Sequence, residues 1–523
     1  GASRRVRGSG STGLGGLPGS MLTGIRLSVA DAMRLVTQAS TMPAHTVSLV
    51  ILEPSDQFSH QRLDRLMGSS LPQLARFRSR LVGRPLGVGQ PLWAEIDDYD
   101  PTSQIHRATI RAPGGQREFA DLIAQLSAGS HDHRKALWEA WSIDGLPDGR
   151  WALAVRMSPA LSDGGIGAAS VWSRLLRSDA HDDRADDQPT QPGRGMPAVG
   201  ELITDVMTQL FEQQIKGLWL VAETVTGVLG AVRGQLRGTS EPDPTPPPVS
   251  SMSGPLPRNV FNAPLTKRRA VAFVSIQLAD LETVSTAFGG DITNVFLAAC
   301  ALSLRAWLQR HDTVPDDPLV IRMPLALSDA AATTFGDRPI VGEIRIPVQL
   351  DDPIEVLTNL HTATERMNTA HRHDAEKSDS TVDLARVASL IPTTVVHAAM
   401  QIYSRLGLRQ RLAPICHASV SYVSGQPVPA YCAGAKVVGM QTVTPLVEGC
   451  GLNITLTTRG EAIDLSVCAC PDNVPAVDDI ATGIADSLDI LVAAARKSPR
   501  GQGRSVVTEM TSHATQHRHG GGY

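Results

Sequence analysis

The clearest pattern of apolar and polar positions in this chain lies at residues 151–157. Four large apolar residues alternate there with small or charged ones, and this period of two predicts a strand with one buried face. They are Trp151, Leu153, Val155 and Met157. The pattern stops at Pro159, gives way to a polar turn at 162–165, and resumes with helical spacing at 171–176. A strand that leads through a turn into a helix is a typical place for functional residues, because rigid elements hold the loop.

Similar patterns predict helices and strands on both sides of this segment. Helices are expected at 29–38 and 62–81, with a strand at 45–52 between them. In the second half, strands are expected at 321–327, 343–348, 416–423, 437–445, 451–457 and 464–469, and helices at 288–308, 353–369, 381–406 and 477–495. The last three of these strands are expected to complete one sheet. Asp291 is placed to cap the helix at 288–308.

Two stretches interrupt these patterns and suggest a division into domains. Residues 178–200 are acidic and poor in apolar side chains, and residues 239–257 are rich in proline and serine, so both are predicted to be linkers. A length of 523 residues fits two domains. The predicted division is a disordered leader or expression remnant at 1–20, a domain at 21–177, a linking region at 178–257, a domain at 258–496 and a disordered tail at 497–523.

The linking region contains a long apolar-patterned stretch at 201–236, which predicts a helix. Its most apolar part, 218–232, is too short to span a bilayer and contains Glu223. Two interpretations stay open. The helix packs on the body of the protein, or its apolar face enters the interface of a membrane or lipid droplet.

Composition limits the classes of partner. The chain has 48 basic and 52 acidic residues, a formal net charge of −4, so it has no general attraction for nucleic acids. The six cysteines lack zinc spacing, and His131 and His133 lack a third ligand nearby, so no metal site is expected. Free thiols in predicted strands fit a reducing compartment, which suggests a cytoplasmic protein or one held at the inner membrane or a lipid droplet.

The segment at 136–176 resembles the bacterial wax ester synthase/diacylglycerol acyltransferase family. That family carries a His-His-x-x-x-Asp-Gly motif at this point, and the present sequence reads Ser158-Pro159-Ala160-Leu161-Ser162-Asp163-Gly164. Asp163 and Gly164 are retained, whereas Ser158 and Pro159 stand where the family has its two histidines. Further segments resemble the same family in the same order, so the resemblance covers residues 21–496 apart from the two linkers.

The resemblance implies the fold and the reaction. The expected fold is α/β (α+β), with two CoA-dependent acyltransferase domains, similar to chloramphenicol acetyltransferase and peptide-synthetase condensation domains. Each domain is a mixed sheet with helices, and a channel runs between them. Acyl-CoA is the co-substrate, no further cofactor is implied, and the acceptor is diacylglycerol or a long-chain alcohol. In the family the second histidine takes the hydroxyl proton, and the motif aspartate is mainly structural.

The resemblance also indicates substrate-binding positions. Pro91, Leu92 and Trp93 match a stretch that borders the acyl channel, although Trp93 is equally interpretable as core packing. Asn294 matches one position of an Asn-Asp pair and is preceded here by Thr293. Ser421 begins the counterpart of a Ser-Asn-Val-Pro-Gly turn, and Asn453 lies in the following predicted strand.

The missing histidines leave the source of a general base open. A serine hydroxyl is too weak a base, and Pro159 has neither a titratable group nor a backbone N–H. His417 shares a predicted polar strand face with Ser419 and Ser421, so it is either a surrogate base or a hydrogen-bonded core histidine. Three hypotheses follow: a slow or atypical O-acyltransferase, an inactive homologue that binds acyl-CoA or lipid and carries it or regulates an active paralogue, and a structural partner at a lipid surface.

Overall fold

The computed structural model describes two large parts of the chain. The described residues are 45–74, 76–82, 92–130, 132, 134–158, 160–161, 167–180, 256–324, 334–335, 338–339, 341–377, 414 and 416–498. Several predictions lie outside them: the helices at 29–38, 201–236 and 381–406, both termini, and most of the two linkers. The same holds for the site candidates Pro91, Pro159, Asp163 and Gly164 and for the His131–His133 pair.

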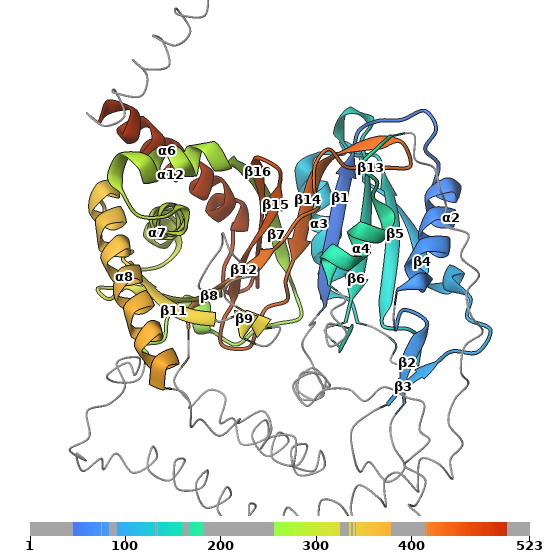
Figure 1. Cartoon of the computed structure of the whole chain (residues 1–523), viewed down its shortest axis with the longest axis horizontal. Helices are drawn as coiled ribbons and strands as arrows, with labels where there is room; N and C mark the ends of the chain where they lie inside the picture. The colour runs from blue at the N-terminus through green and yellow to red at the C-terminus, as the bar shows by residue number, and fades with distance from the viewer. Residues whose placement is uncertain are drawn as a thin grey trace, which may run out of the picture.

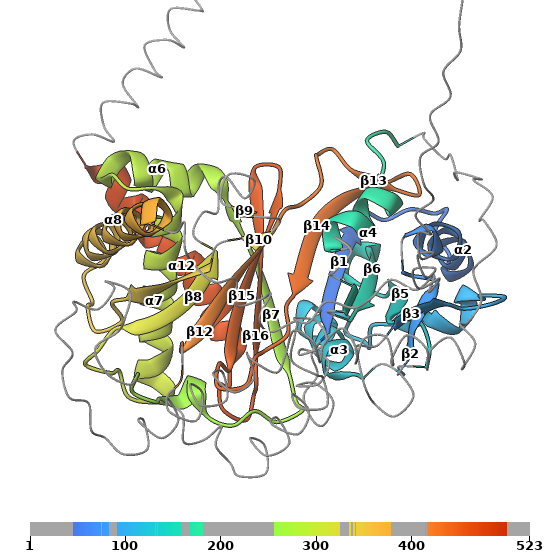
Figure 2. The ribbon, with the colours of Figure 1, turned by 60° about the horizontal axis from the view of Figure 1, so that its bottom comes forward.

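Two six-stranded mixed sheets lie side by side, as Figures 1 and 2 show. The first sheet has the order β13 (Tyr431–Cys432), β14 (Ala435–Val443), β1 (Thr46–Leu52), β6 (Trp151–Met157), β5 (Trp138–Asp144) and β4 (Ile105–Thr109). The second has the order β11 (Val341–Ile346), β8 (Leu319–Pro324), β12 (Ala418–Val423), β15 (Leu452–Arg459), β16 (Ala462–Ala469) and β7 (Ala270–Gln277). Two small pairs complete the strands: β2 (Ser79–Val82) with β3 (Leu92–Glu95), and β9 (Thr334–Phe335) with β10 (Arg338–Pro339).

The helices form layers on these sheets (Figure 1). Helices α6 (Leu278–Phe288), α7 (Ile292–His311), α8 (Pro353–Lys377) and α12 (Val477–Lys497) cover the second sheet on the side away from the first. Helices α2 (His60–Ser70) and α4 (Ala168–Leu175) cover the outer face of the first sheet. Helix α3 (Gln116–Ala128) packs between the sheets, where Phe119 contacts Phe273 of β7 with ring centroids 5.9 Å apart.

Alternation along each strand decides which layer a residue joins. In β15, Ile454 and Leu456 belong to the core under the helices. Asn453 and Thr455 alternate with them along the strand and therefore face the first domain. Strand β6 lies where its pattern predicts, with Leu153, Val155 and Met157 in the outer core beneath α2 and α4. The predicted cap at Asp291 is also present, because its carboxylate accepts a hydrogen bond from the Asn294 N–H at 3.0 Å.

Two predicted elements need correction. The helix expected at 62–81 ends at Ser70, because Pro72 has no N–H to continue it, and a short 3-10 turn over Leu71–Gln73 follows. The strand expected at 437–445 does not join the second sheet. It is β14, which pairs antiparallel with β1 from Val47↔Val443 onward, so the range 258–496 contributes two strands to the first sheet.

Helix α7 is the one helix of the described residues with the length and hydropathy of a membrane span. Its most apolar 18-residue window is 72% buried within the protein, among side chains of α8, α12 and the second sheet. This burial is that of a core helix.

Candidate functional site

Ser158, at the position of the first motif histidine, follows the central strand β6. Its N–H donates to the carbonyl of Leu137 at 3.0 Å, which extends the ladder between β6 and β5 by one residue. Its hydroxyl oxygen accepts from the Ala160 N–H at 3.4 Å, and its carbonyl accepts from the Leu161 N–H at 3.1 Å. The side chain is 3% exposed. Ser158 therefore closes a buried turn and supplies no base.

The last part of β6 faces the second domain. Ala152 and Ala154 share an apolar cluster with Val271 and Phe273 of the second sheet. Since side chains alternate along a strand, Arg156 and Ser158 lie on the same face of the first sheet as these alanines. The motif position therefore faces the junction between the two domains.

Arg156 is a buried cation that the sequence reasoning missed. Its guanidinium forms an ion pair with Glu139 on β5, donates to the Leu126 carbonyl at 2.9 Å and lies 5.3 Å from the ring centre of Trp141. A Cβ at Gly129 would lie 1.7 Å from Arg156 Nη1, so a side chain there would displace the guanidinium. The available signal was one arginine within an otherwise apolar strand. The pair neutralises both charges beside the motif.

A buried polar network occupies the facing surface of the second sheet. Nδ2 of Asn453 donates to Oγ of Ser419 at 2.8 Å and to Oγ of Ser421 at 3.1 Å, and Oγ1 of Thr455 donates to Oδ1 of Asn453 at 2.8 Å. Asn453 is 2% exposed. The structure thus brings together two of the predicted site residues, Ser421 and Asn453, on neighbouring strands.

The network continues into the first sheet. Oγ1 of Thr444 lies 2.9 Å from Oγ1 of Thr455, and Thr444 directly follows β14, whose Val443 pairs with Val47. The end of β6 lies two strands away from β14 in the same sheet, a distance of about 10 Å. We call this group the polar junction; it consists of Ser158, Ser419, Ser421, Asn453, Thr444 and Thr455.

Two further contacts hold the domains at this place. Gln426, just after β12, donates through Nε2 to the carbonyl of Ala169 at 3.0 Å, which ties the Ser421 turn to the helix that follows the motif. Asp464 of β16 accepts from the N–H of Met440 on β14 at 2.8 Å, and from Nε of Arg459 at 2.8 Å. Because Asp464 is fully buried, these bonds fix β14 against the second sheet.

His417 does not fit the role of surrogate base. Its Nδ1 accepts from the Val320 N–H at 2.9 Å, and its Nε2 donates to the Pro257 carbonyl at 2.9 Å. Burial lowers the pKa of His417, and the bond to Pro257 opposes this only in part. Both ring nitrogens are committed to backbone groups, so the ring has no lone pair for a substrate proton. The alternative interpretation, a hydrogen-bonded core histidine, describes what the structure contains.

Asn294 and Trp93 lie apart from the polar junction. Asn294 is 2% exposed and accepts from Oγ1 of Thr364 at 2.8 Å, which joins α7 to α8 on the helical side of the second sheet. Trp93 is 3% exposed and packs in the outer core of the first domain, with the guanidinium of Arg76 5.4 Å from its ring centre. Both side chains serve packing between elements; Leu92, next to Trp93, begins β3.

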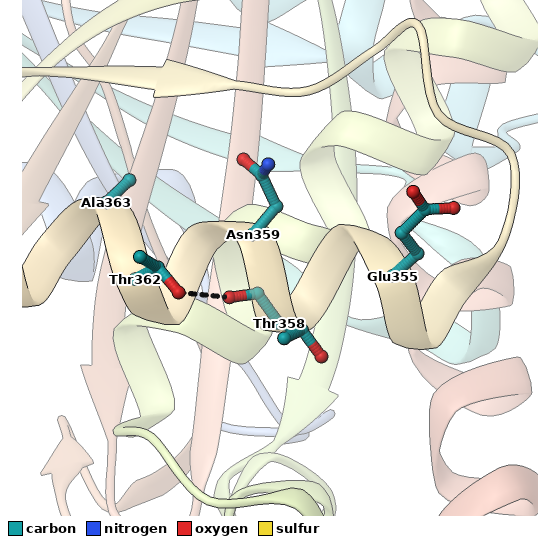
Figure 3. Close-up of a pocket in the computed structure, with 5 residues that line it drawn as sticks. All are labelled: Glu355, Thr358, Asn359, Thr362 and Ala363. Atoms are coloured by element: carbon teal, nitrogen blue, oxygen red, sulfur yellow. Dashed lines mark hydrogen bonds between the residues drawn. The ribbon is translucent and has the colours of Figure 1, made fainter.

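A shallow cavity also lies on the exposed side of α8 (Figure 3). It is lined by Glu355, Thr358, Asn359, Thr362 and Ala363, which all come from this helix. Thr362 donates its hydroxyl to the Thr358 carbonyl at 3.1 Å, and Glu355 is the one titratable residue in the lining. Among the described residues, no three His, Cys, Asp or Glu side chains are grouped to hold a metal ion. The polar junction is therefore the better candidate site.

Comparisons with known proteins agree with this geometry. Residues 27–296 match the family model of the wax ester synthase/diacylglycerol acyltransferase catalytic domain, and residues 343–492 match the C-terminal domain of the same family. Two similar proteins from Mycobacterium tuberculosis H37Rv are each named a putative diacylglycerol O-acyltransferase. One is 28% identical over 475 residues, 90% of this chain and 98% of the relative. The other is 25% identical over 484 residues, 91% and 92% of the two chains.

Solved structures show the same fold. The wax ester synthase/diacylglycerol acyltransferase from Marinobacter aquaeolei VT8 matches with a TM-score of 0.63 and 21% identity, over 90% of this chain and 99% of that one. A trichothecene 15-O-acetyltransferase from Fusarium sporotrichioides matches with a TM-score of 0.50 and 12% identity, over 90% and 95%. The expected fold, two mixed-sheet domains of the CoA-dependent acyltransferase type, is confirmed.

Proposed function

Because this chain belongs to the wax ester synthase/diacylglycerol acyltransferase family, we propose that it binds acyl-CoA and transfers the acyl group to diacylglycerol or a long-chain alcohol at the polar junction. The observation that carries the proposal is the hydrogen-bonded chain from Ser421 through Asn453 and Thr455 to Thr444. This chain runs from the second sheet to the end of β14, two strands away from the end of the motif strand.

These groups suit acyl transfer. As the acceptor oxygen attacks the thioester, the carbonyl oxygen gains negative charge, and donors fixed beside it lower the barrier. The Ser419 and Ser421 hydroxyls are such donors, because each accepts a bond from the Asn453 amide and keeps its own O–H to donate. Ser158 contributes no base, so the rate is expected to lie about 10²–10⁴ below that of a relative with the full motif unless another base acts.

A second candidate function is acyl-CoA or lipid binding without turnover, in which the protein carries lipid or regulates an active relative. The observation that favours it is the replacement of both motif histidines by Ser158 and Pro159. The polar junction serves this function equally, because hydrogen-bond donors that bind a thioester carbonyl need no base.

One experiment separates the two functions. Purified protein is incubated with labelled palmitoyl-CoA and either dioleoylglycerol or hexadecanol, and the lipid products are separated and counted, while palmitoyl-CoA binding is measured by calorimetry. Transfer above a control without protein supports the acyltransferase. Binding without transfer supports the carrier or regulator, and absence of both contradicts the two proposals together. Asn453→Leu, which removes the bonds that orient the Ser419 and Ser421 hydroxyls, is expected to weaken transfer or binding, whereas Asn473→Leu on the turn after β16 serves as the control.

A further inference from the structure

His45 lies immediately before β1, opposite the motif position. In the antiparallel pairing of β1 and β6 the last paired residues are Thr46 and Met157, after Val47 and Arg156. The next step of the same register places His45 across from Ser158. The N–H of Ser158 still continues the ladder to β5, so the strand alignment holds at this step. Residues directly opposite in an antiparallel pair have Cβ atoms about 4.5–5.5 Å apart.

The face on which His45 lies is the one that faces the second domain. Val47 and Leu49 of β1 belong to the cluster shared with β7 and α3. His45, two residues before Val47, lies on the same face by the alternation of side chains along a strand. The His45 side chain is buried, with 8% of its surface exposed. A histidine thus occupies the same face as the missing motif histidine, one strand away.

His45 also lies between the motif strand and the polar network. Strand β1 is flanked by β6 on one side and β14 on the other, and β14 leads directly into Thr444. One strand spacing of about 4.8 Å separates β1 from each neighbour. Thr444 is bonded to Thr455, so the polar network reaches the end of the strand next to β1.

The cation diagonally across from His45 is itself paired with a carboxylate. Arg156, which pairs with Val47 and lies diagonally across from His45, forms its ion pair with Glu139. The second ion pair of Glu139 is to His106 on β4, at 3.2 Å. The guanidinium charge is therefore balanced by a carboxylate within the first sheet.

We propose that His45 is the general base of this chain, in place of the absent motif histidines. The proposal rests on the acyl transfer proposed above. A ring nitrogen of His45 takes the proton of the acceptor hydroxyl while the oxygen of that hydroxyl forms a bond to the thioester carbonyl carbon. The C–S bond of the resulting tetrahedral adduct then breaks, and the CoA thiolate takes the proton from the imidazolium. An ester and free CoA leave, and the base returns to its neutral form.

The test compares His45→Gln and His45→Ala with the parent in the palmitoyl-CoA assay, and measures kcat, KM and palmitoyl-CoA binding for each. His60→Gln is the matched control, because His60 lies on α2 at the outer face of the same sheet and bonds to Ser142 at 2.7 Å. We expect His45→Gln to lower kcat by about 10²–10⁴ with binding unchanged, and His60→Gln to stay within about twofold of the parent. Added imidazole is expected to restore part of the rate of His45→Ala, which a merely structural role of His45 does not predict.

The possible results separate the role of His45 from the acyl transfer proposed for the chain. If the parent transfers acyl groups and His45→Gln transfers them equally fast, the inference is wrong and the acyltransferase proposal stands. If His45→Gln is slow, yet imidazole leaves His45→Ala unchanged, His45 is structural and the inference is likewise wrong. A parent that binds palmitoyl-CoA and transfers nothing contradicts both proposals.

Discussion

The backbone N–H of Val320 donates a hydrogen bond to Nδ1 of His417 over 2.9 Å, and this bond fixes the tautomer of a buried histidine. With Nδ1 as the acceptor, the proton lies on Nε2, which donates to the Pro257 carbonyl at 2.9 Å. The ring therefore joins β8, the start of β12 and the segment before β7. Of the predicted polar face, His417 therefore satisfies backbone groups, whereas Ser419 and Ser421 belong to the polar junction.

Removing this ring is expected to destabilise the protein. His417→Ala leaves the Val320 N–H and the Pro257 carbonyl without their partner, at a cost of about 2–5 kcal/mol for two buried groups. Urea unfolding followed by circular dichroism measures the change. The same variant is expected to keep the palmitoyl-CoA binding of the parent under conditions where both are folded, and a loss of binding in folded protein would show that His417 belongs to the site.

The pH dependence of stability provides a second measurement on the same variant. Burial lowers the pKa of His417 in the folded state below the value of about 6.5 for an unfolded chain. Below that value the unfolded chain binds a proton that the folded chain excludes. The contribution of His417 is therefore complete above about pH 6.5 and is lost as pH falls toward the folded pKa. The parent is expected to lose more stability between pH 7.5 and 5 than His417→Ala; parallel profiles would contradict this.

Substitution of Asp464, which bonds across the two sheets, is expected to lower the free energy of unfolding strongly. It is fully buried and accepts from Ser275, Arg459 and the backbone of Met440. Asp464→Asn leaves the Arg459 charge without its partner and replaces one acceptor by a donor, so we expect a loss of about 3–5 kcal/mol in urea unfolding. The control is Asp472→Asn, which weakens an exposed pair with Arg268 and is expected to change the stability little. Equal losses would show that burial of Asp464 has no special weight.

The cysteines are expected to differ in reactivity although all six are buried. The pKa of Cys416 is lowered, chiefly through its hydrogen bond with the Cys450 thiol 3.6 Å away. Burial instead raises the pKa of Cys432 and of Cys468 to about 12. Iodoacetamide at pH 8, followed by peptide mass spectrometry, is expected to modify Cys416 before Cys432 or Cys468. Cys450→Ala removes the stabilising bond and is expected to slow the reaction of Cys416; a faster reaction would mean that access alone controls it.

The sequence predicted single elements better than their partners. Alternation of apolar residues located β6 at its observed bounds, and the cap at Asp291 located the start of α7, because both signals are local. The partner of β14 is set by contacts between distant parts of the chain, such as Ser48 with Thr442, which are 394 residues apart, and no local pattern contains them. For that reason the strand was assigned to the wrong sheet.

For the candidate site, too, the sequence indicates single residues better than the contacts between them. Ser421 and Asn453 were identified by resemblance, and the structure joins them by a hydrogen bond of 3.1 Å. The same resemblance placed Asn294 in the site, although it bonds to Thr364 within the helical layer. His45 was missed because its relation to Ser158 exists only in the register of two strands that are distant in sequence.

The apolar-patterned stretch at 201–236 allows a prediction about membranes, which rests on its sequence alone. If its apolar positions enter a lipid interface, Leu218→Asp with Leu229→Asp is expected to move the protein from the membrane fraction to the soluble fraction. Fractionation of cells that produce each variant measures this. Ile490→Asp, at an exposed apolar position on α12, is the control for a new surface charge. Equal partitioning of all three proteins would favour packing of the stretch on the body of the protein.

Restoring the motif tests how the base is supplied. Ser158→His with Pro159→His returns both histidines and one backbone N–H, and we expect the double variant to transfer palmitate faster than the parent. The upper limit is about 10²–10⁴, the usual contribution of one general base. Ser158→His alone is expected to do little, because the second motif position holds the base in the family. If His45 serves as the base of the parent, His45→Ala costs less rate in the double variant than in the parent, because a second imidazole then takes the proton. Rate losses that multiply independently in this cycle would show that His45 and the motif histidines act on different steps. A double variant that binds palmitoyl-CoA and gains no rate would mean that the polar junction has lost the geometry for transfer.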